Sequence, residues 1–296
     1  MKLIKPSFEI WNQPAGLEGV YKQIERVGRV CYKSEDKITE DSAKPFVDRM
    51  IKSGHGAMLE HGTVYLKCET EVINRYIHPE DGEEEDFNKL EKYEYNSYSV
   101  TNDDGIYLYV TTNLRVLVEN DWLDDLQYIC EPTEYHEKRI TVHFVCDRGI
   151  SHEFVRHRVM SFAQESTRYC NYSKDKFGNE LTFIQPCWLD DERLKLYGPY
   201  HTVIRDKSLE SIFIASLNNA EKDYIDLIDL GWKPQEARAV LPNSLKTELV
   251  VTGFVSDWNH FFDLRARGTT GAPHPPAKEL AEPLMKEFIA RKYINN

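Results

Sequence analysis

A dense group of cationic and hydroxyl side chains lies in the middle of the chain, in the segment RHRVMSFAQESTRY (156–169). Arg156, His157 and Arg158 open it, and Ser166 and Arg168 follow. A guanidinium presents several N–H donors in one plane and can bind a phosphate or an anionic ring through two parallel hydrogen bonds. The chain as a whole is acidic, with a formal net charge of −12. General solubility therefore does not explain this cationic cluster, and we predict a binding site for a small anion.

The alternative is that these arginines are solvated or pair with Asp and Glu, as arginines near helix ends usually do. Apolar residues recur among them at helical spacing and predict a partly buried helix that carries the cluster: Phe154, Val155, Val159 and Phe162. Because buried arginines need partners, this pattern favours the anion site.

The segment resembles the signature of the flavin-dependent thymidylate synthases, which is Arg-His-Arg, any seven residues and then Ser. Here that pattern runs from Arg156 to Ser166. Four further stretches resemble blocks of the family in the expected order: RVCY (29–32), GHGAMLEHGTVYL (54–66), ARAVLP (237–242) and FFDLRA (261–266). The resemblance covers residues from about 20 to 290, and one long acidic segment fits it poorly.

The resemblance implies a methyltransferase that converts dUMP to dTMP by reductive methylation. Methylenetetrahydrofolate would supply the carbon, reduced FAD would carry the hydride and NADPH would reduce the flavin, and no protein cysteine would attack the ring. The resemblance also implies a homotetramer whose sites are assembled from several subunits. The sequence has no GxGxxG fingerprint, so side chains would have to bind the flavin phosphates.

Two overlapping sets of binding residues follow from the resemblance. Arg265 would be catalytic, because a fixed positive charge beside the pyrimidine favours its enolate-like form. Ser166 is given only a binding role, since no adjacent base with an orienting group can be traced. The implied dUMP contacts are Glu153, Arg156, Gln164, Ser166, Thr167, Arg168, Arg238 and Arg265, and the implied FAD contacts are His61, Thr63, Arg156, His157, Arg158, Gln164 and His260.

Considered without the resemblance, three of these residues have ordinary structural interpretations. Arg265 would be a cation at a helix C-terminus, His61 a core histidine and Thr63 a strand residue. Three residues also depart from the family's pattern, namely Cys31, Glu153 and His260. Glu153 would repel a nucleotide phosphate unless it binds a sugar hydroxyl or pairs with Arg156. After Arg265, the stretch RGTTGAPHPP (267–276) differs from the continuous helix that the family pattern would lead us to expect.

Composition places the chain among ordinary globular proteins. Its 296 residues are 41% hydrophobic, which is enough to bury a core without disulfides. The acidic balance argues against nonspecific binding of nucleic acid. No apolar run is long enough for a signal peptide or a membrane span, which predicts a cytoplasmic protein. The six cysteines form no CxxC or His-paired spacing, so we expect reduced thiols and no metal site.

Periodicity predicts the elements that must position these residues. A strand at 138–149 should have Thr141 and His143 on one face and Val142 and Phe144 on the other, with both faces covered. Ser151 is expected to cap the helix that carries the signature. Segment 78–105 is highly charged and is expected to be exposed and mobile. Helices are expected at about 17–32, 42–53, 205–230, 234–241, 245–267 and 277–292, a strand at 63–68, and a change from strand to helix within 107–121.

These elements predict an α/β fold with a central, mostly antiparallel sheet flanked by long helices and a helical C-terminal part. We expect one domain over residues 1–296 with an acidic insertion at about 69–137. Two alternatives remain open. A nucleotide-binding regulatory protein would have the anion pocket without a flavin, and an interaction module would neutralise the cations with its own carboxylates, for example those at 81–86.

Overall fold

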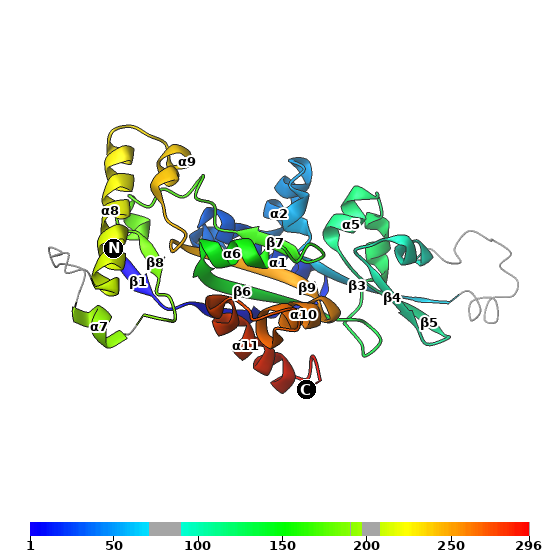
Figure 1. The fold of residues 1–296 in the computed structure, drawn as a ribbon. Helices are drawn as coiled ribbons and strands as arrows, with labels where there is room; N and C mark the ends of the chain where they lie inside the picture. Colours follow the sequence, from blue (N-terminus) through cyan, green and yellow to red (C-terminus); the bar gives the residue numbers. More distant parts are fainter. Residues whose placement is uncertain (71–89, 190, 197–207, 296) are drawn as a thin grey trace, which may run out of the picture.

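The structure is a computed structural model that describes residues 1–70, 90–189, 191–196 and 208–295 (Figure 1). Its strands are β1 (Lys2–Ile4), β2 (Ser7–Trp11), β3 (Thr63–Glu69), β4 (Val100–Asp103), β5 (Tyr107–Asn113), β6 (Arg139–Asp147), β7 (Ser161–Gln164), β8 (Thr182–Ile184) and β9 (Lys246–Phe254). Its α-helices are α1 (Gly16–Tyr32), α2 (Ala43–Lys52), α3 (Gly56–Leu59), α5 (Leu114–Glu119), α6 (Arg148–Phe154), α7 (Asp191–Leu196), α8 (Leu209–Asp229), α9 (Pro234–Ala237), α10 (Val255–Phe262) and α11 (Pro275–Ala290).

A four-stranded sheet in the order β2-β6-β9-β7 forms the centre of the fold, and all of its pairings are antiparallel. Strands β6 and β9 pair over their full lengths, with Phe144 opposite Leu249. The predicted α/β class with a mostly antiparallel sheet and C-terminal helices is confirmed. Among the described strands, the only parallel pair is β1 with β8.

Both faces of the central sheet are covered, as the alternation along β6 predicts. Val142 and Phe144 point into a core that they share with α6, α10 and α11, where Trp258 is fully buried. Figure 1 shows α10 and α11 on one side of the sheet and α1 and α2 on the other. Burial of each large apolar side chain contributes about 1.5–3 kcal/mol, so this layer is a main source of stability.

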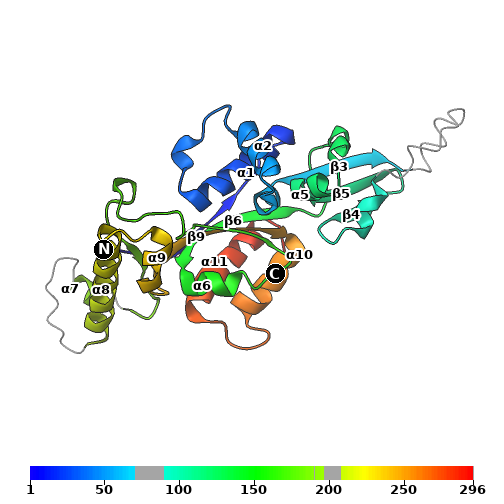
Figure 2. The ribbon, with the colours of Figure 1, turned by 90° about the horizontal axis from the view of Figure 1, so that it is seen from above.

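Helix α1 covers the opposite face through an apolar stripe at helical spacing that includes Val27 and Val30. On the same face His143 stacks on Trp11, with ring centroids 4.8 Å apart. The view from above shows α1 lying along the sheet beside α2 (Figure 2). The helices expected at 17–32 and 42–53 are thus confirmed as α1 and α2.

Residues from 90 to 137 and β3 build a second unit beside the central sheet. Strands β3, β5 and β4 form an antiparallel sheet with α5 packed on it, which confirms the strand at 63–68 and the change from strand to helix within 107–121. Leu90 and Tyr93 are fully buried there, so the exposure expected for 78–105 is wrong for these residues. Residues 71–89, including the acidic run at 81–86, lie outside the described residues.

A third group of elements gathers near the N-terminus, where β1 and β8 pair and α8 and α9 pack nearby (Figure 1). The helix expected at 205–230 is confirmed from residue 209 onward, and 205–207 lie outside the described residues. The segment expected to be a helix at 234–241 is only one short α-helical turn, α9, followed by a 3-10 turn at Arg238–Val240.

Two predictions about the C-terminal half are wrong. Segment 245–267 is not one helix but strand β9, helix α10 and a π-helical turn at Asp263–Arg267. In β9 the run that includes Val250, Val251 and Thr252 is buried on both faces, so it lacks the alternation that usually marks a strand. The helix expected at 277–292 is confirmed as α11.

The predicted helix around the signature is also corrected. Helix α6 ends at Phe154, Arg156–Arg158 lie in the following turn, and Phe162 belongs to strand β7. The N-cap is Asp147 rather than Ser151, because the Asp147 carboxylate accepts a hydrogen bond of 2.8 Å from the amide of Ile150.

A buried network of charges lies under the end of β7 and was missed by the sequence analysis. Lys246 Nζ lies 2.8 Å from Glu165 Oε2 and also pairs with Glu248. Lys33 Nζ reaches Glu248 at 2.6 Å, and His143 Nε2 lies 2.9 Å from its other oxygen. Burial alone would raise the pKa of Glu248, but the hydrogen bond from His143 and the two lysine charges hold it far below its usual value. The network fixes the strand end that precedes Ser166.

Replacing Lys246 with methionine is expected to lower the free energy of unfolding by about 3 kcal/mol, because the Glu165 side chain, only 1% exposed, loses its cationic partner. Urea denaturation at neutral pH measures this change. The matched control is Lys286→Met, whose side chain is 68% exposed on α11 and whose pair with Glu282 should contribute less than about 0.5 kcal/mol. Equal effects of the two substitutions would contradict a structural role for the network.

In the described part of the chain, no helix is both long and apolar enough to cross a membrane. The six cysteines are all unpaired. Cys31 is buried at the end of α1, and burial raises the pKa of its thiol to about 12, so it is held as an inert neutral group.

Candidate active site

Arg265 lies at the centre of the first cluster of predicted site residues. The π-helical turn after α10 points its guanidinium at α6, where Nη1 donates to Glu153 Oε2 at 2.8 Å and Nη2 donates to the Glu153 carbonyl at 2.9 Å. Its Nε donates to His157 Nε2 at 3.3 Å. A guanidinium has five N–H groups, and these three bonds leave one on each terminal nitrogen. The side chain is 16% exposed, so the remaining donors can reach a ligand.

Glu153 therefore pairs with Arg265 and not with Arg156, which was one of the two possibilities in the sequence. The contact joins residues 112 positions apart. It removes the electrostatic objection to a carboxylate at this position, because the adjacent guanidinium compensates the charge of Glu153.

His157 is buried between Arg265 and the aromatic core, with its ring 5.0 Å from that of Phe261. Burial, together with the charges of Arg265 and His260, lowers the pKa of His157 to about 4. The ring is therefore neutral at physiological pH. Because Nε2 accepts from Arg265, the ring proton is assigned to Nδ1. The exposed His260 lies beside it, with ring centroids 5.9 Å apart.

A second cluster forms around the loop after β7. Arg238, on the turn after α9, points Nη1 at Thr167 Oγ1 at 3.4 Å. The Ser166 amide donates to the carbonyl of Cys31 at 3.0 Å, which ties the loop to the end of α1. Since Cys31 contributes only its backbone here, its departure from the family pattern does not alter this bond. The Arg168 amide donates to Ser166 Oγ at 3.3 Å and closes the loop.

Gln164 connects the two clusters. Its amide donates to Ser151 Oγ on α6 at 2.8 Å and to Thr247 Oγ1 on β9 at 3.1 Å. This bond joins α6 to β7, which is an edge strand of the central sheet (Figure 1). The path from Arg265 through α6 and β7 to the Arg238 loop is thus one continuous region built from four of the five sequence blocks.

Three further cations of the predicted site are exposed: Arg156, Arg158 and Arg168. None of them forms an ion pair within 4.0 Å with a carboxylate that the structure describes. Their positive charge is therefore available to a bound anion. This is the property that the anion-site interpretation requires, and the solvated alternative shares it.

His61 and Thr63 lie in a buried polar layer at the start of β3, against the central sheet. His61 is fully buried and its Nδ1 lies 2.8 Å from Thr252 Oγ1. Burial, reinforced by the charge of Arg139, lowers the pKa of His61 to about 3. Thr63 is held by Gln13, whose side-chain amide exchanges two hydrogen bonds of 2.8 Å with the Thr63 backbone.

The stretch after Arg265 does leave the helix. Gly268 ends the π-helical turn with a φ of 72°, and a Cβ there would lie 2.9 Å from the Gly271 carbonyl oxygen. Only glycine adopts this conformation at this spacing without strain. The chain then runs free of helix to Pro275, where α11 begins, so the expected difference from a continuous helix is confirmed.

The buried histidines predict a loss of stability in acid. The folded pKa of His61 lies below its ordinary value of 6.5, so the unfolded chain binds the proton first. The stabilisation is present above pH 6.5 and is lost as pH falls toward 3, by about 1.4 kcal/mol per pH unit for each such histidine. Urea denaturation of the His61→Gln variant between pH 6 and 4 should give a slope that is smaller by that amount. An unchanged slope would contradict the burial of a neutral ring.

Comparison with known proteins gives matches at the level of the family and of single proteins. A family model described as thymidylate synthase complementing protein matches residues 132–291, more than half of the chain. The flavin-dependent thymidylate synthase of Pyrococcus furiosus is 32% identical over 120 residues, 40% of this chain and 43% of that protein. Its counterpart from Pyrococcus horikoshii is 31% identical over 149 residues, 50% of this chain and 54% of that protein. The chain thus matches about half the length of these curated relatives. One solved structure that aligns with the chain is the UMP/dUMP methylase PolB from Streptomyces cacaoi bound with 5-Br dUMP. The alignment covers 98% of this chain and 93% of the PolB chain, with 17% sequence identity and a TM-score of 0.44.

Proposed function

The chain belongs to the thymidylate synthase complementing protein family, and from this premise we propose that it is a flavin-dependent thymidylate synthase. It would transfer a one-carbon unit from methylenetetrahydrofolate to dUMP and reduce it to the methyl group of dTMP. FAD would be the bound cofactor and NADPH the reductant. The observation that carries the proposal is the contact of Arg265 with Glu153 and His157, because it brings the last sequence block onto the signature.

Arg265 is the proposed catalytic residue. Two of its N–H groups have no partner among the described residues, and they can bind a carbonyl oxygen of the uracil ring where negative charge develops. Glu153 and the neutral His157 then act as positioning residues, since they accept from the other three N–H groups. A guanidinium held in this way needs no reorganisation when the ring becomes electron-rich, which is the condition for electrostatic stabilisation of a transition state.

The nucleotide phosphate is proposed to bind at the loop after β7. Arg168 and Arg238 supply charge, and Ser166 and Thr167 supply hydroxyl and backbone donors. Guanidinium groups combined with backbone N–H groups are a common solution to phosphate binding. Arg156 and Gln164 precede this loop in the chain, and we assign them to the nucleotide as well.

The flavin is proposed to lie against the turn that carries Arg156, His157 and Arg158, with Gln164 and His260 beside it and with His61 and Thr63 on its other side. The exposed guanidiniums of Arg156 and Arg158 fit a cofactor with anionic phosphates. When bound, reduced FAD supplies the hydride for the one-carbon unit. The contribution of the chain is to bind and orient this group, and the buried His61 ring would have to become accessible to touch it.

We also propose that the enzyme is a cytoplasmic homotetramer. The support is the exposure of Arg156, Arg158 and Arg168, which leaves these three cations accessible to a neighbouring subunit. A site completed by several subunits would also explain why Arg156, Arg158 and Arg168 have no described ionic partner.

Product formation tests the proposal. The purified protein is mixed with dUMP, methylenetetrahydrofolate, FAD and NADPH, and dTMP is measured by mass spectrometry. Omission of any one of the four, including FAD from protein stripped of flavin, should abolish dTMP. Formation of dTMP without FAD would contradict the flavin mechanism, and binding of dUMP without turnover would favour a nucleotide-binding regulatory protein.

A further inference from the structure

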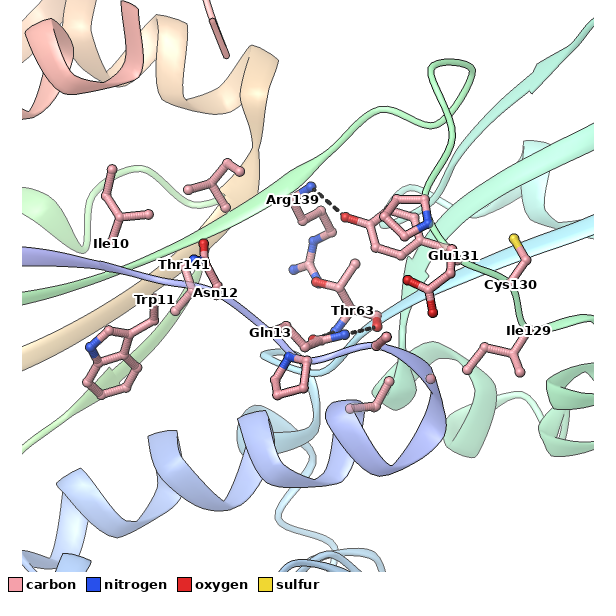
Figure 3. A pocket seen from close by; sticks show the side chains of 17 residues that line it. Ile10, Trp11, Asn12, Gln13, Thr63, Ile129, Cys130, Glu131, Arg139 and Thr141 are labelled. Carbon is pink, nitrogen blue, oxygen red and sulfur yellow. Dashed lines mark hydrogen bonds between the residues drawn. The ribbon is translucent and has the colours of Figure 1, made fainter. Parts of the chain in front are cut away.

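A cavity of about 280 Å³ lies where the second unit joins the central sheet. It is bounded by the end of β2 and the start of α1, by β3, by residues 129–132 and by the start of β6 (Figure 3). Its floor includes the buried Thr63, Arg139 and Thr141, and its rim includes the exposed Asn12 and Glu131, so it opens to solvent. None of the arginines of the proposed active site lines it.

Arg139 gives the cavity a buried positive charge. The residue is only 9% exposed, and burial lowers its pKa to about 10, so it remains a cation at neutral pH. Its Nη1 donates to the Glu60 carbonyl at 2.9 Å, and Nη2 donates to Ser161 Oγ at 3.2 Å. These acceptors are neutral. Among the described residues no carboxylate lies within 4.0 Å of it, and Nε has no partner at all. A buried guanidinium without a counter-charge is costly unless an anion completes it.

The positive end of helix α1 meets the same cavity. Residues 12–16 line the cavity and lead into α1, whose N-cap is Ala15. Ala15 has an extended backbone conformation but no side chain that can accept from the first helical N–H groups. A 17-residue helix therefore presents uncapped donors and a positive dipole end to the space into which the Arg139 guanidinium points (Figure 3).

The remaining walls define the rest of the ligand. Pro14 and Ile129 add apolar surface to the lining, whereas Ile10 and Ile140 line it from strand positions whose side chains pack into the core with α10 and α11. The Tyr65 hydroxyl accepts from the Arg139 amide at 3.4 Å, which leaves its own proton free to donate. Glu131 is the one acidic residue among the lining residues, and it stands at the exposed rim.

We propose that this cavity is a binding site for a small organic anion, separate from the active site. A terminal carboxylate or phosphate would pair with Arg139 and the N-terminus of α1, and an apolar body would lie against Pro14 and Ile129. The site goes beyond the proposed catalytic function, although Thr63 lines it and is also a proposed flavin contact. Occupancy would stabilise the junction between the second unit and the central sheet, because both contribute walls.

Calorimetric titration with phenyl phosphate, benzoate and inorganic phosphate tests the site. The protein is first saturated with FAD and dUMP so that the proposed active site is occupied. We expect one further site, with phenyl phosphate or benzoate binding more tightly than inorganic phosphate because the apolar walls contribute. The tighter of the two aromatic anions identifies the head group. Absence of any binding beyond that of FAD and dUMP would overturn the proposal of a separate site.

Four variants locate the binding. Arg139→Met should weaken it at least tenfold, whereas Arg267→Met, an exposed arginine on the turn after α10, should leave it unchanged. Arg139→Met could disturb folding, so Ala15→Asp is the second test. A carboxylate at this N-cap should raise the thermal midpoint of unfolding while it weakens binding of the anion several-fold. Glu131→Gln should tighten binding several-fold by removing the opposing charge. Binding that is indifferent to Ala15→Asp and Glu131→Gln would place the anion elsewhere and refute the proposal.

Discussion

Replacing Arg265 with alanine is expected to lower the rate of dUMP methylation by about 10²–10³-fold while leaving a folded, yellow protein. The substitution removes the guanidinium whose two free N–H groups face the proposed substrate. It leaves Glu153 without its partner, but the Glu153 side chain is 28% exposed and can be solvated. The expected loss therefore appears in kcat, with little change in the flavin spectrum or the thermal midpoint.

The matched control is Arg267→Ala. Arg267 lies in the same π-helical turn, but its guanidinium pairs with Asp263 at 2.8 Å and not with Glu153 or His157. It should retain near-normal activity. Glu153→Gln is a third variant, whose neutral side chain still accepts a hydrogen bond from Arg265 but orients it less firmly. The loss of methylation rate should therefore be smaller than for Arg265→Ala. A colourless or unfolded Arg265→Ala protein would assign this residue a structural role instead.

Replacing Arg238 with methionine is expected to weaken dUMP binding by about 10–100-fold, the loss that accompanies removal of one charged hydrogen-bond partner of about 1.5–3 kcal/mol. Arg238 is exposed, and its contact with Thr167 is long at 3.4 Å, so its removal should cost the fold little. Equilibrium titration with dUMP measures the effect. Deoxyuridine, which lacks the phosphate, should bind the variant and the parent protein equally.

Lys233→Met is the control for this experiment. Lys233 is an exposed cation at the N-cap of α9, five residues before Arg238, and among the described residues its side chain forms no ion pair. This substitution should change dUMP affinity by less than about twofold. Raising the salt concentration should reduce the difference in dUMP affinity between the parent protein and Arg238→Met. If the two substitutions weaken dUMP binding equally, general electrostatic attraction and not a phosphate contact would explain the effect.

Local patterns predicted those elements whose periodicity was unambiguous. The apolar stripe of α1 is compatible only with a helix and the alternation of β6 only with a strand, and both predictions are confirmed. Strand β9 was misassigned because it is buried on both faces, so a continuous apolar run had no period of two and was interpreted as a helix. The cluster around Arg156 was misassigned for a related reason, since Phe162 fits helical spacing but pairs with β9.

The candidate site likewise has one part that the sequence predicts and one part that only the fold reveals. The sequence motif identifies the residue types, but it cannot show that Glu153 meets Arg265, because that contact depends on how α6 and α10 pack on the sheet. The network of Lys246 with Glu165 and the isolated Arg139 have no motif. Their importance comes from burial, which single-residue patterns do not report. A charged residue at a strand position would have been the only sequence indication of either.

The proposed active site holds a flavin beside a uracil nucleotide, and the visible absorbance of the purified protein tests this most directly. We predict that the protein binds FAD, shows the absorbance of oxidised flavin and is bleached by NADPH, and that dUMP changes the rate of bleaching. A colourless protein that neither binds added FAD nor oxidises NADPH would contradict the account.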